Sequence, residues 1–269
     1  MPQSKEMKGK IMSRIPIGLE LFSVRNELAE DVRGTIKAVA EMGYEGVEFA
    51  GPPRHSAEEL KGLLDEFGLI CCGWHTPFNL VQEDTLDATI EFNKVLENPY
   101  VIVPGIPGEL RQSRADWLKL AGIFNGIADK LAAHGMVTGY HNHHVEFTPL
   151  DGELPWDTFF GNTNEGVVMQ LDMGNALSGG ADLVDILERY PRRAGTVHLK
   201  PYTESLGEVD RHAGFRPVIG EDSVPWDEIF RVCEATGGTK WYIVEYESDA
   251  FPPLEAVERC LKALKGMGK

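Results

Sequence analysis

Short apolar runs alternate along the chain with longer amphipathic segments. The runs have the length of strands and are rich in β-branched and aromatic residues, which is typical of buried strands. They predict eight strands, at residues 16–21, 46–50, 69–75, 100–104, 136–142, 166–172, 195–200 and 240–246. Because helical segments lie between them, we expect the strands to run parallel in successive βαβ units.

The segments between the runs carry helical periodicity and helix-end signals. Residues 31–42 place Val32, Ile36 and Val39 on one face. Residues 56–67 open with Ser-Ala-Glu-Glu, a capping-box pattern, and stop before a glycine. Helices are also predicted at residues 115–134, 181–190, 226–236 and 253–264.

Eight βα units in a chain of 269 residues predict a single closed (β/α)8 barrel, the TIM-barrel architecture. The main alternative, a doubly wound open sheet, binds nucleotides with a glycine-rich turn after its first strand. Residues 22–26 follow the first predicted strand and contain no glycine. We therefore expect residues 15–269 to form one barrel domain, preceded by a disordered polar leader at residues 1–14.

One connection in this pattern is long and irregular. Residues 201–224 follow the seventh predicted strand, are polar and show little periodicity. Such connections in compact domains are commonly functional, and on a barrel this one lies over the mouth. We interpret it as a lid.

Composition excludes several classes of protein. A formal net charge of −16 repels phosphate backbones, which argues against nucleic acid as a partner. No apolar run has the length of a membrane span, and the start of the chain lacks the apolar stretch of a secretory signal. The four cysteines form no CxxC pair, so we expect buried thiols in a cytoplasmic protein.

Seven of the eight predicted strands finish in acidic or histidine side chains, where the active sites of such barrels lie. Buried ionisable groups are costly unless they are paired or bind metal, and a cation relieves the repulsion between converging carboxylates. Carboxylates with one or two imidazoles suit Mn²⁺, Co²⁺, Zn²⁺ or Fe²⁺ without choosing among them. The residues are Glu20, Glu48, His75, the stretch from His141 to Glu146, Asp172, His198 and Glu245.

Each of these residues also has a structural interpretation. An Asp after a strand often caps the next helix, and a strand-end His is often a satisfied structural residue. The apolar run before Glu245 makes such an explanation harder there. The combination of Asp172, His198 and Glu245 on three successive strands favours a metal site. The chain contains no Gly-x-Ser-x-Gly elbow, phosphate-binding glycine loop or zinc-finger spacing.

Several motifs resemble the sugar phosphate isomerase/epimerase group of xylose-isomerase-like barrels. They are Leu-Phe-Ser-Val-Arg, Gly-Tyr-Glu-Gly-Val-Glu-Phe-Ala-Gly, Tyr-His-Asn-His-x-x-Glu-Phe, Leu-Asp-x-Gly-Asn, Val-His-Leu-Lys and Val-Glu-Tyr-Glu, spread over residues 16–264. The resemblance implies a metal site of Glu, Asp, His and Glu from the last four strands. Asp172, His198 and Glu245 match that pattern. The glutamate available at the fifth strand is Glu146, and the neighbouring His141 or His143 are alternatives.

The resemblance implies an enzyme that removes a proton next to the carbonyl of a ketose or keto-sugar, through an enediolate stabilised by the metal. We expect an isomerase or epimerase that uses Mn²⁺, with Co²⁺, Zn²⁺, Mg²⁺ and Fe²⁺ as alternatives. The second interpretation is a lyase or dehydratase, of the kind that acts on a keto-inositol or cleaves 3-keto-glycosides or C-glycosides. A non-catalytic sugar-binding barrel is a lesser alternative, and a homo-oligomer or a small partner subunit fits any of these.

Roles for single residues follow from the same resemblance. His143 or Glu245 is expected to take the proton while the other returns it, and Lys200 to stabilise the developing oxyanion. The absence of a multi-arginine phosphate clamp favours an unphosphorylated sugar. Further substrate contacts are expected from Glu48, His75 and His141, with His212 and Arg211 closing over the sugar from the lid.

Overall fold

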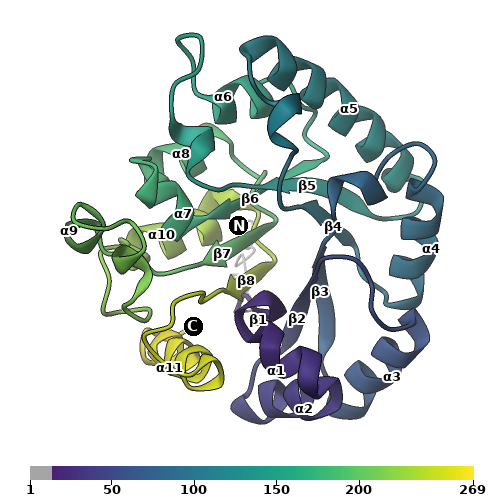
Figure 1. Cartoon of the computed structure of the whole chain (residues 1–269), viewed down its shortest axis with the longest axis vertical. Helices are drawn as coiled ribbons and strands as arrows, with labels where there is room; N and C mark the ends of the chain where they lie inside the picture. The colour runs from purple at the N-terminus through teal and green to yellow at the C-terminus, as the bar shows by residue number, and fades with distance from the viewer. Residues whose placement is uncertain (1–13) are drawn as a thin grey trace, which may run out of the picture.

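The computed structural model describes residues 14–269, which form a closed eight-stranded barrel (Figure 1). Each strand pairs in parallel with the next, and β8 returns to pair with β1. The predicted TIM barrel is therefore confirmed, with strand ends displaced by one or two residues. The strands are β1 Ile17–Glu20, β2 Gly46–Ala50, β3 Ile70–His75, β4 Tyr100–Val103, β5 Val137–His141, β6 Val167–Asp172, β7 Thr196–Leu199 and β8 Trp241–Val244.

Helices surround the barrel (Figure 1). All six predicted helices are present, although the last part of the predicted 226–236 helix is a π-helical turn, Cys233–Gly237. Five further helices, α1, α4, α6, α7 and α9, were not predicted. The full set is α1 Arg25–Glu30, α2 Val32–Met42, α3 Ala57–Phe67, α4 Leu86–Val95, α5 Arg114–Ala132, α6 Pro155–Phe160, α7 Met173–Ser178, α8 Leu183–Arg189, α9 Glu204–Gly207, α10 Trp226–Val232 and α11 Pro253–Gly266.

The predicted capping box begins helix α3. The Glu59 backbone N–H donates to Ser56 Oγ over 3.2 Å, and Glu59 Oε2 accepts from the Ser56 backbone N–H over 2.9 Å. The helix ends at Gly68, whose φ of 71° lies in the left-handed region that glycine tolerates best. Local sequence therefore sets both ends of this helix.

The core fills the barrel and the layer between strands and helices. Because both faces of a parallel barrel are covered, its strands are buried along nearly their whole length. An aromatic cluster lies between β5 and helices α5 and α6, where Tyr140 meets Trp117, Phe124 and Phe159 with ring centroids 5.3–6.1 Å apart. This packing holds β5 firmly against its helices.

The four cysteines are free and buried, as predicted. Burial raises the pKa of Cys71, Cys233 and Cys260 to about 12, so these thiols stay protonated near neutral pH. None of the four takes part in the polar cluster described below.

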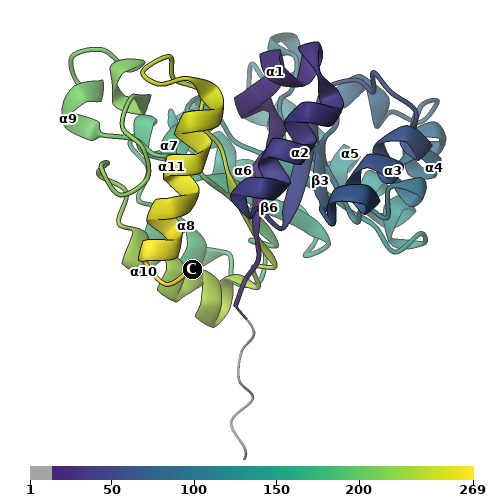
Figure 2. The same ribbon diagram turned by 90° about the horizontal axis from the view of Figure 1, so that it is seen from below.

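The βα loops gather at one end of the barrel. In Figure 2, β1 enters from below, and α1 and α9 both lie at the opposite end. The segment 201–224 contains α9 and a short turn, Ala213–Phe215. It is anchored there, because Tyr202 is buried against Phe215 and the Tyr246 hydroxyl donates to the Arg216 carbonyl over 2.6 Å.

Of the predicted leader, residues 1–13 lie outside the described residues. The first described residue, Arg14, forms an ion pair of 2.8 Å with Glu45. No helix in residues 14–269 is both long and apolar enough to cross a membrane.

Candidate functional site

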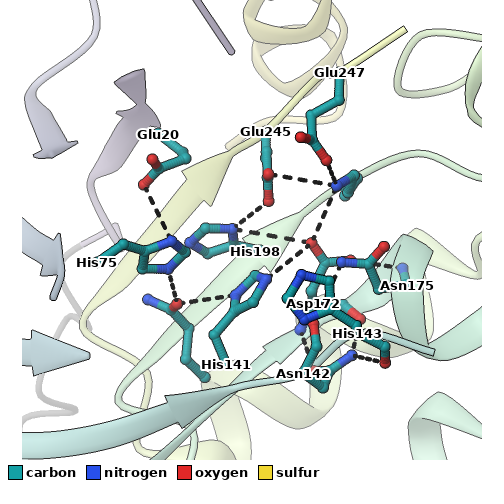
Figure 3. Close-up of polar contacts among 12 residues, drawn as sticks. Glu20, His75, His141, Asn142, His143, Asp172, Asn175, His198, Glu245 and Glu247 are labelled. Carbon is teal, nitrogen blue, oxygen red and sulfur yellow. Dashed lines mark hydrogen bonds and ion pairs between the residues drawn. The ribbon is translucent and has the colours of Figure 1, made fainter. Parts of the chain in front are cut away.

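The ionisable side chains at the strand ends converge in one buried cluster at the mouth of the barrel (Figure 3). Each is less than a tenth exposed. The structure thus brings together residues that the sequence separates by more than two hundred positions. The members are Glu20, Glu48, His75, His141, Asp172, His198 and Glu245.

Within this cluster, four residues from consecutive strands offer ligand atoms to a common point. Atoms of His141, Asp172, His198 and Glu245 all lie within 4.8 Å of one another. Asp172 Oδ2 is 3.8 Å from His141 Nε2 and 4.0 Å from His198 Nδ1. His198 Nδ1 is in turn 2.7 Å from Glu245 Oε2. Two carboxylates and two imidazoles form a donor set that suits a divalent transition-metal ion.

The two histidines of this set are oriented through their other ring nitrogens. Gln170 donates its amide N–H to Glu48 Oε1 over 3.0 Å, so its Oε1 faces the other way and accepts from His141 Nδ1 over 3.1 Å. His198 Nε2 lies 2.6 Å from Glu48 Oε2. His141 Nε2 and His198 Nδ1 are therefore left to face the common point, as in metal-binding histidines held by outer partners.

The two carboxylates are held in the same way. Asp172 Oδ1 accepts from the Asn175 backbone N–H over 2.6 Å, and Glu245 Oε1 lies 3.4 Å from Lys200 Nζ. Asp172 thus caps helix α7 with one oxygen while its other oxygen points into the cluster. The structural and the metal-binding interpretations of Asp172 are compatible.

Two carboxylate oxygens of the cluster have no hydrogen-bond partner among residues 14–269, and one of them belongs to the converging set. Asp172 Oδ2 is fully buried and accepts no hydrogen bond from any of residues 14–269. Burial raises the pKa of Asp172 well above its usual range, against the lowering effect of Lys200. A cation beside this oxygen would supply the missing interaction and favour the ionised form. The residues present therefore fit a divalent metal ion.

Glu146, expected as the fifth-strand ligand, lies outside this converging set. It sits in the turn Val145–Phe147, where its Oε1 accepts from the Tyr140 hydroxyl over 2.6 Å. Its Oε2 accepts from the His143 backbone N–H over 2.8 Å. Because neither oxygen of Glu146 belongs to the converging set, whereas His141 does, the geometry does not support Glu146 as a ligand and favours the alternative, His141.

Glu48 belongs to the cluster but does not line the cavity described below, so the geometry does not support the expected hydroxyl contact. Its carboxylate is enclosed by His198 and Gln170, with His75 at 3.5 Å. Gly73 on the next strand makes room for it, because a Cβ there would come within 2.0 Å of Glu48 Oε1. Glu48 orients its neighbours.

Glu20 and His75 extend the cluster toward β1 and β3. Glu20 Oε1 accepts from the Phe22 backbone N–H over 3.1 Å, while its buried Oε2 has no hydrogen-bond partner among the described residues. That oxygen is 4.0 Å from His75 Nδ1, and His75 Nε2 donates to Gln170 Oε1 over 2.6 Å.

A cavity of about 940 Å³ opens onto the cluster. On this side it is lined by His75, His141, His143, Lys200 and Glu245. His143 is exposed and its ring lies 5.6 Å from that of His141. The expected acid–base and substrate-binding residues, apart from Glu48, Arg211 and His212, therefore face one space.

His212 and Arg211 are exposed in the segment 201–224, and neither lines this cavity. The backbone N–H of His212 donates to Asp210 Oδ1 over 3.0 Å. The substrate contact expected of His212 is thus not preformed in this structure.

Three polar residues of the site were not singled out from the sequence. Gln170 joins Glu48 to the histidines, and the Asn175 backbone N–H donates to Asp172 Oδ1. Asn142 ties β5 to β6, since its Oδ1 accepts from the Asp172 backbone N–H over 2.8 Å and its Nδ2 donates to the Asp172 carbonyl. Asn142 and Asn175 lie inside the motifs quoted above, and their place in those motifs is the sequence signal that could have identified them.

The closed barrel with a polar mouth places the chain among TIM-barrel proteins with a candidate metal centre at the strand ends. Residues 36–267 match the model of the xylose isomerase-like TIM barrel family, and the chain belongs to that family.

Several known proteins similar to the chain carry the names of carbohydrate-modifying enzymes. The inosose dehydratase of Serratia proteamaculans is 25% identical over 245 residues, covering 80% of this chain and 82% of the relative. That of Clostridium perfringens is 26% identical over 262 residues, covering 86% and 88%. A solved sugar phosphate isomerase/epimerase from Parabacteroides distasonis shares the fold with a TM-score of 0.79 at 22% identity, covering 94% of this chain and 98% of its own.

Proposed function

We propose that this protein is a divalent-metal-dependent enzyme that removes a proton next to the carbonyl of a keto-sugar. The observation that carries the proposal is the set of four side chains from β5 to β8, each anchored at one atom and converging at another. The set opens onto a cavity large enough for a sugar. Membership of a family that includes sugar-modifying enzymes supports the same conclusion.

The roles of the chain's residues follow from their positions. His141, Asp172, His198 and Glu245 would hold the ion, for which we propose Mn²⁺ as the first candidate. When bound, the ion supplies Lewis acidity toward carbonyl and hydroxyl oxygens. Burial opposes the charge of Lys200, but the carboxylates around it, Glu245 first, raise its pKa above the usual range. Lys200 therefore remains a fixed positive charge beside the cavity, suited to an enediolate oxygen.

His143 is the residue we propose as the proton-transferring base. It lines the cavity, and its backbone is held by Glu146. Glu245, the other candidate, belongs to the proposed ligand set, and its second oxygen is paired with Lys200. An imidazole can both accept and return a proton, which suits general base catalysis.

Elimination of water is the second candidate outcome of the same proton abstraction. Two observations favour it: the relatives named inosose dehydratase, and a histidine instead of a glutamate at the end of β5. Elimination needs one base and one acid, whereas epimerisation needs proton transfer at both faces of the same carbon.

Deuterium exchange tests the proposal and separates its outcomes. The Mn²⁺-loaded protein is incubated in D₂O with ketoses and keto-inositols and followed by proton NMR. We expect deuterium at the carbon next to the carbonyl, accompanied by an isomer, an epimer or a dehydrated product. Protein that contains stoichiometric metal but exchanges no such proton on any of these substrates would refute the proposal.

The role of His143 is tested in the same assay. His143→Ala is expected to slow exchange by about 10²-fold or more, the lower end of general base contributions. The matched control is His144→Ala, because His144 is the next histidine along the chain and does not line the cavity. Equal rates in the two variants would exclude His143 as the base.

A further inference from the structure

The cavity extends well beyond the metal-ligand set, and only on one side. It continues toward the ends of β1, β2 and β3, which are neighbouring strands of the barrel (Figure 1). The side chains that line this part of the cavity are mostly apolar. We call this part the apolar arm. Its defining residues are Phe22, Leu28, Phe49, Leu60, Trp74 and Phe78.

The wall of the apolar arm is fixed in place. The indole N–H of Trp74 donates to the Gly51 carbonyl over 2.8 Å, so the only polar atom of this side chain is satisfied. Its ring stacks on Phe49 with centroids 4.9 Å apart and meets the edge of Phe92 at 5.1 Å. Trp74 therefore presents a rigid apolar surface to a ligand.

The lip of the arm carries an exposed aromatic residue. Phe22 is 40% exposed although it lines the cavity. The Arg25 guanidinium lies over its ring, 4.4 Å from the centroid, and donates to the Phe22 carbonyl over 2.9 Å. Exposed aromatic surface within a cavity gains free energy when a ligand covers it.

Polar residues of the arm lie at its rim. Arg25, Asn26, Arg54 and Asn79 line the same side of the cavity and are all exposed. The buried part of the arm is thus apolar. A second sugar ring there would lose hydrogen bonds to water without replacement, whereas an aromatic ring would not.

The size of the cavity agrees with a ligand larger than one sugar. Its volume of about 940 Å³ lies near the upper end of the roughly 300–1,000 Å³ of sites for drug-sized ligands. A free keto-sugar beside His141 and Lys200 would leave the arm in water. We infer that the substrate is a keto-sugar glycoside whose aromatic aglycone occupies the apolar arm. This inference rests on the proposed function for the position of the sugar.

Equilibrium binding of unreactive glycosides tests the inference separately from catalysis. Phenyl β-D-glucopyranoside and methyl β-D-glucopyranoside carry the same sugar and no carbonyl, so neither can be enolised. In calorimetric titration of the metal-loaded full chain, we expect the phenyl glycoside to bind about tenfold tighter or more, as burial of a phenyl ring predicts. Equal affinities would overturn the inference, even if deuterium exchange on free keto-sugars succeeds.

A pair of variants locates the effect. Phe22→Ala is expected to remove most of the preference for the phenyl glycoside and to leave the methyl glycoside unaffected. Ile70→Thr is the control, because Ile70 is 56% exposed and begins β3, away from the cavity. Unchanged phenyl affinity in Phe22→Ala, or tighter binding of methyl β-cellobioside than of the phenyl glycoside, would overturn the aromatic assignment.

Discussion

At the scale of single residues, one neutral side chain organises the charged ones. Gln170 accepts from His75 and His141 through Oε1, and its Nε2 donates to Glu48 and to Thr196. Because the two ends of an amide differ, this arrangement selects which nitrogen of each histidine carries the proton. The free nitrogen of His141 is thereby aimed at Asp172 before any metal arrives.

The competing assignments for the fifth-strand ligand give opposite results on mutation. His141→Ala is expected to lower metal content well below one ion per chain after dialysis, because it removes a nitrogen from the converging set. Glu146→Gln is expected to retain metal, since this residue binds Tyr140 and the His143 backbone instead. Metal is measured by inductively coupled plasma mass spectrometry.

The exposed histidine at the end of α5 provides the control for that comparison. His134→Ala should bind metal as the unmodified protein does, and circular dichroism should show all three variants folded. Loss of metal from Glu146→Gln with retention in His141→Ala would reverse the assignment.

The alternation of side chains along β5 favours His141 over Glu146 as the fifth-strand ligand. Successive strand side chains point to opposite faces. Tyr140 faces helices α5 and α6, so His141 must face the barrel interior. The resemblance to the isomerase/epimerase motifs favoured a glutamate as the fifth-strand ligand. The turn that directs Glu146 toward Tyr140 is irregular, so no hydrophobic periodicity in the sequence predicts it. Gln170 is uncharged, so an argument from ionisable groups at the strand ends could not identify it.

At the scale of elements, local signals decided where the longer helices begin. Ser56→Ala removes the acceptor for the Glu59 N–H and should lower the free energy of unfolding by about 1 kcal/mol. Urea denaturation followed by circular dichroism measures this change. Ser205→Ala in helix α9 is the control and should change it by less than about 0.5 kcal/mol. Similar losses in both variants would remove the capping box as the cause.

The elements that sequence reasoning missed are mostly short. Helices α1, α6 and α7 each contain six residues, too few turns for a hydrophobic period to be visible. Helix α7 also begins directly after β6, with Asp172 ending one element and capping the next. The strands were found because burial on both faces gives continuous apolar runs, which do not depend on the loops.

At the scale of the whole molecule, the barrel holds four carboxylates in one buried cluster in a chain of net charge −16. Their mutual repulsion is a cost that a divalent cation relieves. An ion at a hundred times its Kd adds about 2.7 kcal/mol to stability. Chelation should therefore lower the melting temperature by about 5 °C or more, as measured by scanning calorimetry.

The ligand set provides the control for this thermal shift. His198→Ala should show the same melting temperature with and without chelator, because it no longer binds the ion tightly. A chelator effect of equal size in this variant would place the stabilising metal elsewhere in the protein.

The pairing of β1 with β8 also has a consequence for how the protein is made. The Tyr246 backbone N–H donates to Ser23 Oγ across 223 residues of sequence, and Leu19 lies opposite Val244. On the ribosome, the outer edge of β1 therefore stays without its partner until nearly the whole barrel has been translated. Open edges invite other chains. Synthesis of the last strand is thus the step at which an open, aggregation-prone sheet becomes a closed barrel.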